Sequence, residues 1–170
     1  HVTTLGKFEV RLGGRALEKH AWNQRRAGEL LALLLITHGH ALTAEQAAEA
    51  LATGKSPESA QTVVHHATSE LRRVLEPELP DRRFPSRYLE ATDRLITFRL
   101  PAGSWLDFEA FEQAVSEQDW EQALALYGGE FIPQYRYADW AAARREQLAE
   151  RFRESLLALA KTHLAASDWP

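Results

Sequence analysis

The chain has 170 residues, of which 45% are hydrophobic and 26% are charged, with a formal net charge of −4. This composition supports one large or two small folded domains and excludes a disordered chain. The absence of cysteine excludes disulfide frameworks and thiolate chemistry, and a cytoplasmic location is expected. The longest apolar run, Leu30 to Ile36, is too short to cross a bilayer, and no membrane role is expected. Because the chain starts at His1 and lacks methionine, we expect a fragment of a longer protein.

The charge is unevenly distributed along the chain. Residues 1–100 contain 14 Lys and Arg against 12 Asp and Glu, whereas residues 101–170 contain 6 against 12. Two parts with different electrostatics indicate two domains with different partners. The positive excess in the first part is small, so any affinity for DNA must come from local clustering of basic side chains.

The first 51 residues predict a small sheet followed by two helices. Short β-type runs at residues 2–5 and 8–12 precede a Gly–Gly turn and predict an antiparallel sheet. A leucine-rich helix is expected from Trp22 to Thr37, with Arg25 and Arg26 at its start. Thr43 to Gln46 forms a capping box, which predicts a second, short helix that runs to about residue 51.

The most informative stretch runs from Ser56 to Leu75. Ser56 can cap a helix, Pro57 suits its first position, and Pro77 stops it just beyond its end. At 100° per residue, one side is expected to be buried and consists of Ala60, Val64, Ala67, Thr68, Leu71 and Leu75. The other side presents Thr62, His66, Ser69 and Arg73, with His65 and Arg72 on one flank and Glu70 on the other. An apolar back with a polar, basic-ended front is typical of a DNA recognition helix, and it also suits an ordinary amphipathic surface helix.

A helix, a short helix, a turn and a longer helix follow one another in the order of a helix-turn-helix core. Two strand-like runs at residues 87–91 and 95–100 come next and predict a β-hairpin, which in this position is a wing. Its arginines, Arg87, Arg94 and Arg99, would contact phosphates or the minor groove, the alternative being that they are solvated strand residues.

Residues 101–104 form the expected domain boundary, and everything after them is predicted to be helical. Helices are expected from Asp107, over Trp120 to Tyr127, and from about residue 139 to residue 166. The second has the aromatic and small-residue spacing of a tetratricopeptide helix. The third is expected to bury a stripe made of Leu148, Phe152, Leu156, Leu159 and Leu164.

The sequence offers little for catalysis or for metal binding. It contains no glycine-rich phosphate loop, no nucleophile elbow and no paired carboxylates outside solvated helix faces, so an enzyme and a cofactor are not expected. His38 and His40, like His65 and His66, are close pairs, but no cysteine or well-spaced acidic residue supports a metal site. His66 is better explained as a hydrogen-bond donor to DNA.

Taken in order, these motifs resemble the regulators that join an OmpR-like winged helix to a bacterial transcriptional activator domain, namely the SARP-type and MalT-like activators. The resemblance covers nearly the whole chain. In the first part it rests on Phe8–Val10, the leucine-rich helix, Pro57–Glu58, Leu71–Arg73 and Arg87–Leu89. In the second part it rests on Trp105–Phe111, Ala123–Tyr127, Gly129–Pro133 and Trp140.

The resemblance implies an α+β part followed by an all-α part. Residues 1–100 would be an OmpR-like winged helix-turn-helix, and residues 101–170 a truncated tetratricopeptide-like activator domain. The implied function is that of a sequence-specific transcriptional regulator, an activator, which binds double-stranded DNA at tandem repeats. The helical domain would contact RNA polymerase, another protein or a second protomer. Base edges would be read by Thr62, His65, His66, Ser69 and Arg73, and the backbone would be held by Arg72, Arg25, Arg26, Arg87 and Arg94.

Four positions depart from the family pattern. Gln61 and Glu70 stand where basic residues are usual, Ala52 where an aromatic residue is usual, and Gly28 where arginine is frequent. Glu70 is expected to pair within its helix with Arg73 or His66. These departures leave a second interpretation open, in which the chain is a protein-interaction scaffold whose winged helix has lost DNA binding.

Overall fold

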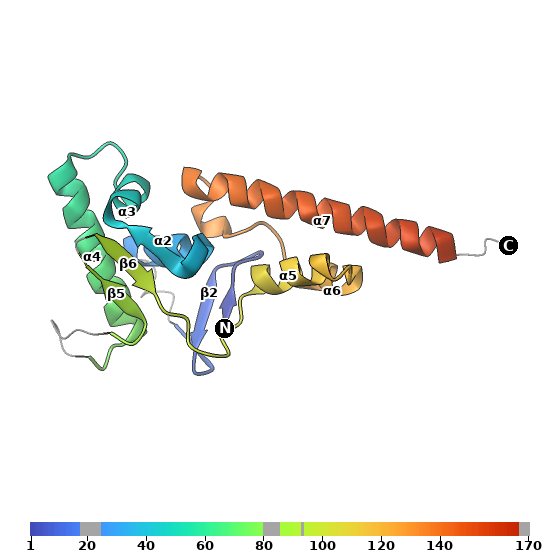
Figure 1. Cartoon of the computed structure of the whole chain (residues 1–170), viewed down its shortest axis with the longest axis horizontal. Coiled ribbons are helices and arrows are strands. Elements are labelled where there is room, and N and C mark those ends of the chain that lie inside the picture. The colour runs from blue at the N-terminus through green and yellow to red at the C-terminus, as the bar shows by residue number, and fades with distance from the viewer. Residues whose placement is uncertain (18–24, 80–85, 93, 167–170) are drawn as a thin grey trace. The chain divides into compact units, whose positions relative to one another are not determined.

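The computed structural model describes residues 1–17, 25–79, 86–92 and 94–166 (Figure 1). Packing divides the chain into two compact units: residues 12–103 form the inserted unit, and residues 1–11 together with 104–170 form the helical unit. The chain thus has an α+β part followed by helices, as expected. The expected division between residues 100 and 101 lies close to the second crossing, but residues 1–11 pack with the helices that follow residue 104.

The described residues of the inserted unit contain three α-helices, one three-stranded sheet and the short strand β3. Its elements are β3 (Arg15–Ala16), α2 (Arg25–Ile36), a 3-10 turn (His38–His40), β4 (Ala41–Thr43), α3 (Ala44–Leu51), α4 (Pro57–Leu75), β5 (Leu89–Ala91) and β6 (Leu95–Phe98). The helices α2 and α3 both pack against α4. The strands β4, β6 and β5 form an antiparallel sheet in that order.

The sequence places α2 and α3 by two different signals. The five leucines of α2 between residues 30 and 35 are all buried, which confirms the predicted core helix. At the start of α3, the Gln46 amide nitrogen donates to Thr43 Oγ1 at 3.1 Å, and the Thr43 amide donates to Gln46 Oε1 at 2.9 Å. The predicted capping box is therefore confirmed, and it fixes where the chain turns from β4 into α3.

The predicted hairpin is confirmed, and a third strand joins it. In the hairpin, Glu90 of β5 lies opposite Thr97 of β6. On the other side of β6, Leu42 of β4 lies opposite Ile96. The strand β4 is only three residues long and its partner is more than 50 residues away in the chain, so no local pattern indicates it.

The helical unit begins with β1 (Val2–Thr3), which pairs antiparallel with β2 (Glu9–Leu12). After the inserted unit, the chain continues with α5 (Asp107–Ser116), α6 (Trp120–Leu126), a 3-10 turn (Pro133–Tyr135) and α7 (Asp139–Ala166). The helix α5 packs against α6, and α6 packs against α7.

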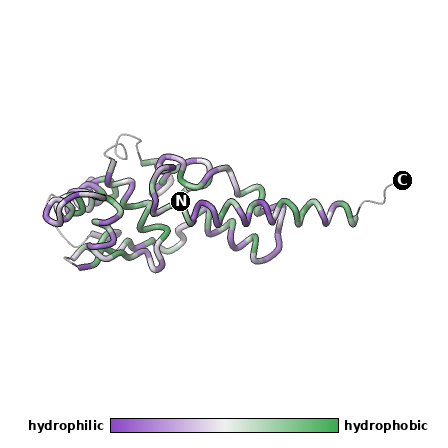
Figure 2. Tube along the Cα trace, turned by 90° about the horizontal axis from the view of Figure 1, so that it is seen from above, coloured by the Kyte–Doolittle hydropathy of each residue, from purple (hydrophilic) through white to green (hydrophobic). Residues whose placement is uncertain are grey.

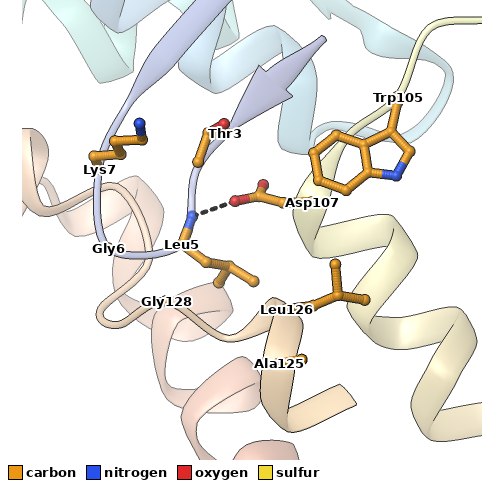
Figure 3. A pocket seen from close by; sticks show the side chains of 9 residues that line it. All are labelled: Thr3, Leu5, Gly6, Lys7, Trp105, Asp107, Ala125, Leu126 and Gly128. Carbon is orange, nitrogen blue, oxygen red and sulfur yellow. Dashed lines mark hydrogen bonds between the residues drawn. The ribbon is translucent and has the colours of Figure 1, made fainter. Parts of the chain in front are cut away.

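A buried carboxylate ties the first strand region to α5. Asp107 accepts hydrogen bonds from the Thr4 amide nitrogen at 2.7 and 2.8 Å and from Thr4 Oγ1 at 2.6 Å. It also accepts from the Leu5 amide nitrogen at 2.8 Å, the bond drawn in Figure 3. It lines a hollow of about 400 Å³ together with Gly6 and Gly128, among others. The backbones of these glycines approach so closely that a Cβ on Gly6 would lie 2.4 Å from the Gly128 carbonyl oxygen. Residues 1–11 are therefore an integral part of the helical unit.

The apolar stripe of α7 is only half buried, which corrects the prediction for its second half. Leu148 is fully buried, and Phe152 stacks on Tyr127 with ring centroids 4.2 Å apart. In contrast, Leu156 and Leu164 are 47% and 61% exposed. With 28 residues α7 is roughly 42 Å long, almost three times the length of the 10-residue α5, so it extends beyond its partners.

Hydrophobic residues continue along the last turns of α7 (Figure 2). Nevertheless, no helix in the described ranges is long and apolar enough to span a membrane.

Candidate nucleic-acid interface

The helix α4 begins and ends where the sequence predicts. Ser56 caps its N-terminus, since the Ser59 amide nitrogen donates to Ser56 Oγ at 3.4 Å, and Pro57 takes the first helical position. The helix ends at Leu75, two residues before Pro77. These signals set a 19-residue helix of about five turns.

The two faces of α4 differ as expected. All six residues predicted to be buried are buried, namely Ala60, Val64, Ala67, Thr68, Leu71 and Leu75. On the outward face Thr62, His65, His66 and Arg73 are exposed, and Ser69 is half-buried. The rings of the two histidines lie 6.2 Å apart and nearly perpendicular, so they present different edges to solvent.

Two expectations for α4 are wrong. Arg72 was expected to hold the DNA backbone from the flank of the helix, but it is only 3% exposed, because it lies one turn after the buried Thr68 and next to Leu71. A buried guanidinium is not available to a phosphate. Glu70 forms no ion pair with Arg73 or His66 among the residues that the structure describes.

A hollow of about 240 Å³ lies between α4 and the three-stranded sheet. Apolar side chains of Ala44, Val64, Ala91 and Ile96 contribute to its lining, and polar ones do so as well, namely Gln61, His65, Thr68, Ser69 and Thr92. The outward face of α4 and the tip of the hairpin therefore border one concave surface. A surface made of a helix and a neighbouring hairpin is of the kind that can contact one groove and the adjacent backbone of a duplex.

The arginines of the hairpin have different surroundings. Arg94 is exposed at the tip, where its carbonyl oxygen accepts a hydrogen bond from the Ala44 amide nitrogen at 3.0 Å. Arg99 pairs with Glu90 across the two strands. Arg87 pairs with Glu76 at 2.9 Å and also with Glu78, so its charge is already compensated by two carboxylates.

Glu76 holds the end of α4 against the start of the hairpin. Its carboxylate is fully buried and accepts hydrogen bonds from Ser86 Oγ, from the Arg87 amide nitrogen at 3.1 Å and from Arg87 Nε at 2.9 Å. Burial raises the pKa of this carboxyl, but the bonds from Ser86 and Arg87 outweigh burial and lower the pKa below its ordinary value of 4.5. The group is therefore held in its charged form.

The start of α2 is described only in part. Arg26 pairs with Glu29 at 2.8 Å, a partly buried interaction within the helix that leaves the Arg26 side chain 42% exposed. The expected beginning of the helix at Trp22 and the side chain of Arg25 lie outside the described residues. A backbone contact by either arginine stays a prediction.

The structure of EmbR from Mycobacterium tuberculosis, in complex with a low-affinity phosphopeptide, is similar to this chain, with a TM-score of 0.72 and 20% sequence identity. The match covers 97% of this chain and 45% of that chain, so the chain spans less than half of the length of EmbR. At this identity the likeness is one of fold, and as such it confirms the resemblance expected from the sequence. No family model and no curated protein matches this sequence.

The sequence analysis did not predict the buried, hydrogen-bonded roles of two carboxylates that organise the structure, Glu76 and Asp107. An acidic side chain at the C-terminus of a helix is unfavourable in the helix dipole, so Glu76 directly after Leu75 indicates a local partner. Asp107 opens α5 between the buried Leu106 and Phe108, which is an unusual place for a carboxylate that lacks hydrogen-bond donors. Both signals are present in the sequence, but neither identifies the donor.

Proposed function

We propose that the chain is the DNA-binding and activator part of a sequence-specific, SARP-type transcriptional regulator. In this proposal α2, α3 and α4 form an OmpR-like helix-turn-helix, and β5 and β6 form the wing. The observation that carries it is the outward face of α4, where Thr62, His65 and His66 are exposed. This face borders the hollow between α4 and the three-stranded sheet. The fold likeness to EmbR supports the same assignment.

The outward face of α4 would enter the major groove. The Thr62 hydroxyl donates to the Glu58 carbonyl oxygen at 3.0 Å and can accept from a base edge, whereas the His66 imidazole can donate or accept. Base edges present a distinct pattern for each base pair. Arg94 at the hairpin tip would contact a phosphate or the minor groove beside the site. Base contacts from α4 would give specificity, and charge contacts from the hairpin would give position and affinity.

The helical unit would contact protein. In the proposal α5, α6 and α7 form a tetratricopeptide-like domain that binds RNA polymerase, another protein or a second protomer. The exposed leucines in the last turns of α7 support this role, because repeat helices bury such faces against a neighbour. Activation would follow from recruitment of that partner to the bound DNA.

One observation favours the second interpretation, a scaffold that does not bind DNA. Arg87 and Arg99 are both paired with carboxylates of the same unit, and Gln61 rather than a basic residue is exposed on α4. The outward surface therefore carries less free positive charge than its arginines suggest. Binding to a duplex separates the two interpretations.

The test uses a duplex that the 170-residue chain selects from a random-sequence library, and measures its affinity over a series of salt concentrations. A specific binder loses affinity linearly in log[salt] and still prefers the selected duplex over random DNA. His66→Ala should weaken the selected duplex about fivefold to tenfold and change binding to random DNA little. His38→Ala is the matched control, because His38 is exposed in the 3-10 turn and belongs neither to α4 nor to the hairpin.

A chain that selects no sequence and shows no affinity at low salt is the scaffold. Equal effects of the His38 and His66 substitutions would contradict the assignment of α4 as the recognition helix.

A further inference from the structure

The contacts of Glu76 connect the two elements that are proposed to meet DNA. Glu76 caps the C-terminus of α4, where its amide nitrogen donates to the Arg72 carbonyl oxygen at 2.8 Å. Its carboxylate accepts from Ser86 and Arg87, which directly precede the hairpin. Ser86 Oγ in turn accepts from the amide nitrogens of Tyr88 at 3.2 Å and Leu89 at 3.0 Å. A continuous chain of hydrogen bonds therefore runs from the last turn of α4 into β5.

The same chain of bonds reaches the second strand of the hairpin. The Arg99 amide nitrogen donates to the Tyr88 carbonyl oxygen at 2.7 Å, which extends the ladder between β5 and β6. The Arg87 guanidinium lies over the Tyr88 ring, 5.5 Å from its centroid. The arginine is thus fixed by Glu76, Glu78 and Tyr88, and its orientation is set by the protein.

A buried charge needs such partners, and it fixes geometry more than it stabilises. Placing a carboxylate away from water is unfavourable unless it is fully hydrogen-bonded, and an apolar contact of the same volume would often stabilise the fold as well or better. What the carboxylate provides is direction, because its oxygens accept from donors that must lie at fixed positions. Glu76 thus defines where the hairpin leaves α4.

We propose that Glu76 is a positioning residue, which holds the wing to the recognition helix so that Arg94 and His66 meet the duplex in one fixed geometry. Arg87 serves this arrangement rather than the duplex. A wing that is already placed loses no conformational freedom on binding, so its contacts contribute more to affinity. This inference rests on the proposed function, since it assigns a role within the same DNA interface.

The experiment is a pair of double-mutant cycles on the selected duplex, with the 170-residue chain. Glu76→Gln should weaken binding about fivefold, the effect of losing one cationic contact at the wing. Combined with Arg94→Ala it should weaken binding no further, because both changes remove the same contact. Combined with His66→Ala the effects should multiply, because α4 itself is unchanged. Glu49→Gln is the matched control and should bind as the wild type does, since it makes the same change of charge at an exposed position of α3, outside the contacts of Glu76 and Arg87.

Two results would overturn the proposal: wild-type affinity of the Glu76→Gln variant, or a loss that multiplies with both other substitutions, as a general destabilisation would. Circular dichroism establishes that the variant is folded at the temperature of the assay. If the Glu76→Gln variant does not fold, the Arg87→Ala variant tests the proposal instead, because Arg87 lies at the surface. Its effect should be absorbed by Arg94→Ala, whereas multiplying effects would show that Arg87 touches DNA directly. If the wild type selects no duplex, the proposed function itself has failed, which is a separate outcome.

Discussion

Just after the end of α5, one residue adopts a left-handed backbone conformation, which glycine adopts more readily than other residues. Gln118 has a φ of 60°, in the left-handed region. Its amide nitrogen donates to the Val115 carbonyl oxygen at 3.1 Å, and the Asp119 amide donates to the Ala114 carbonyl oxygen at 2.9 Å. These are the two bonds of a Schellman motif, in which the left-handed position is usually a glycine. The side chain of Gln118 is exposed and contributes little in return.

Gln118→Gly should therefore stabilise the helical unit. The left-handed conformation is unfavourable for a residue with a Cβ, whereas glycine adopts it freely, and part of the gain is offset by the greater freedom of glycine in the unfolded chain. We expect an increase of about 0.5 kcal/mol in the free energy of unfolding, measured from the urea midpoint at an unchanged slope. Gln113→Gly, within α5, should instead lower stability by about 1 kcal/mol. A loss of similar size for both variants would contradict this interpretation.

Among the elements, the segment that contains β1 depends on one side chain of α5. Asp107 accepts from Thr4 and Leu5 while it is itself only 3% exposed. An asparagine at this position keeps one oxygen but turns an NH₂ group toward backbone N–H groups. Buried donors would then lose their acceptor, which leaves them unsatisfied away from water.

Asp107→Asn should lower the stability of the helical unit by about 2 kcal/mol or more. Hydrogen exchange should speed up first at the amides of Thr4 and Leu5. The matched control is Asp119→Asn, because Asp119 caps α6 from an exposed position and asparagine caps a helix as well as aspartate does. Equal losses for the two variants would show that the contacts of Asp107 have no special weight.

The elements that could be predicted are those whose signals are local. Caps and proline placed α3 and α4, and periodicity separated the buried face of α4 from its outward face. The strand β4 could not be predicted, because it exists only through pairing with β6, far along the chain. The second half of α7 was mispredicted for a related reason, since periodicity shows which face is apolar but not whether a neighbour reaches it.

The candidate site was predictable to the same degree. The exposure of Thr62 and His66 followed from the helix period alone. The surroundings of Arg72 and Arg87 could not be predicted from the helix period, because they depend on the tertiary structure around each guanidinium. Arg72 is buried, and Arg87 is paired with Glu76. Sequence therefore identified the surface, and structure decided which of its cations remain available.

At the scale of the whole molecule, the helical unit is assembled from two separate stretches of chain. Besides the contacts of Asp107, the Val2 amide donates to the Trp105 carbonyl oxygen at 2.8 Å, and the Ile132 amide donates to the Thr4 carbonyl oxygen at 2.7 Å. The buried Leu5 also forms an isolated antiparallel β-bridge with the fully buried Phe131. A fragment that lacks residues 1–11 would expose these groups and leave the Asp107 carboxylate without its donors.

We therefore expect residues 104–170 alone to lack a cooperative unfolding transition. The same residues joined to residues 1–11 through a flexible glycine and serine linker in place of the inserted unit should regain one. Circular dichroism during urea titration measures both, and residues 12–103 serve as the comparison for the inserted unit. Cooperative unfolding of residues 104–170 by themselves would show that the first strands are dispensable.

The insertion also determines how the molecule responds to tension. Residues 12–103 leave from and return to one and the same body, at residues 11 and 104. A stretching force applied at residues 1 and 170 therefore acts first on the helical unit. The inserted unit experiences the force only after the helical unit has unfolded. The order of rupture is dictated by connectivity, not by relative stability, and the part that is proposed to grip DNA is mechanically shielded from strain transmitted along the polypeptide.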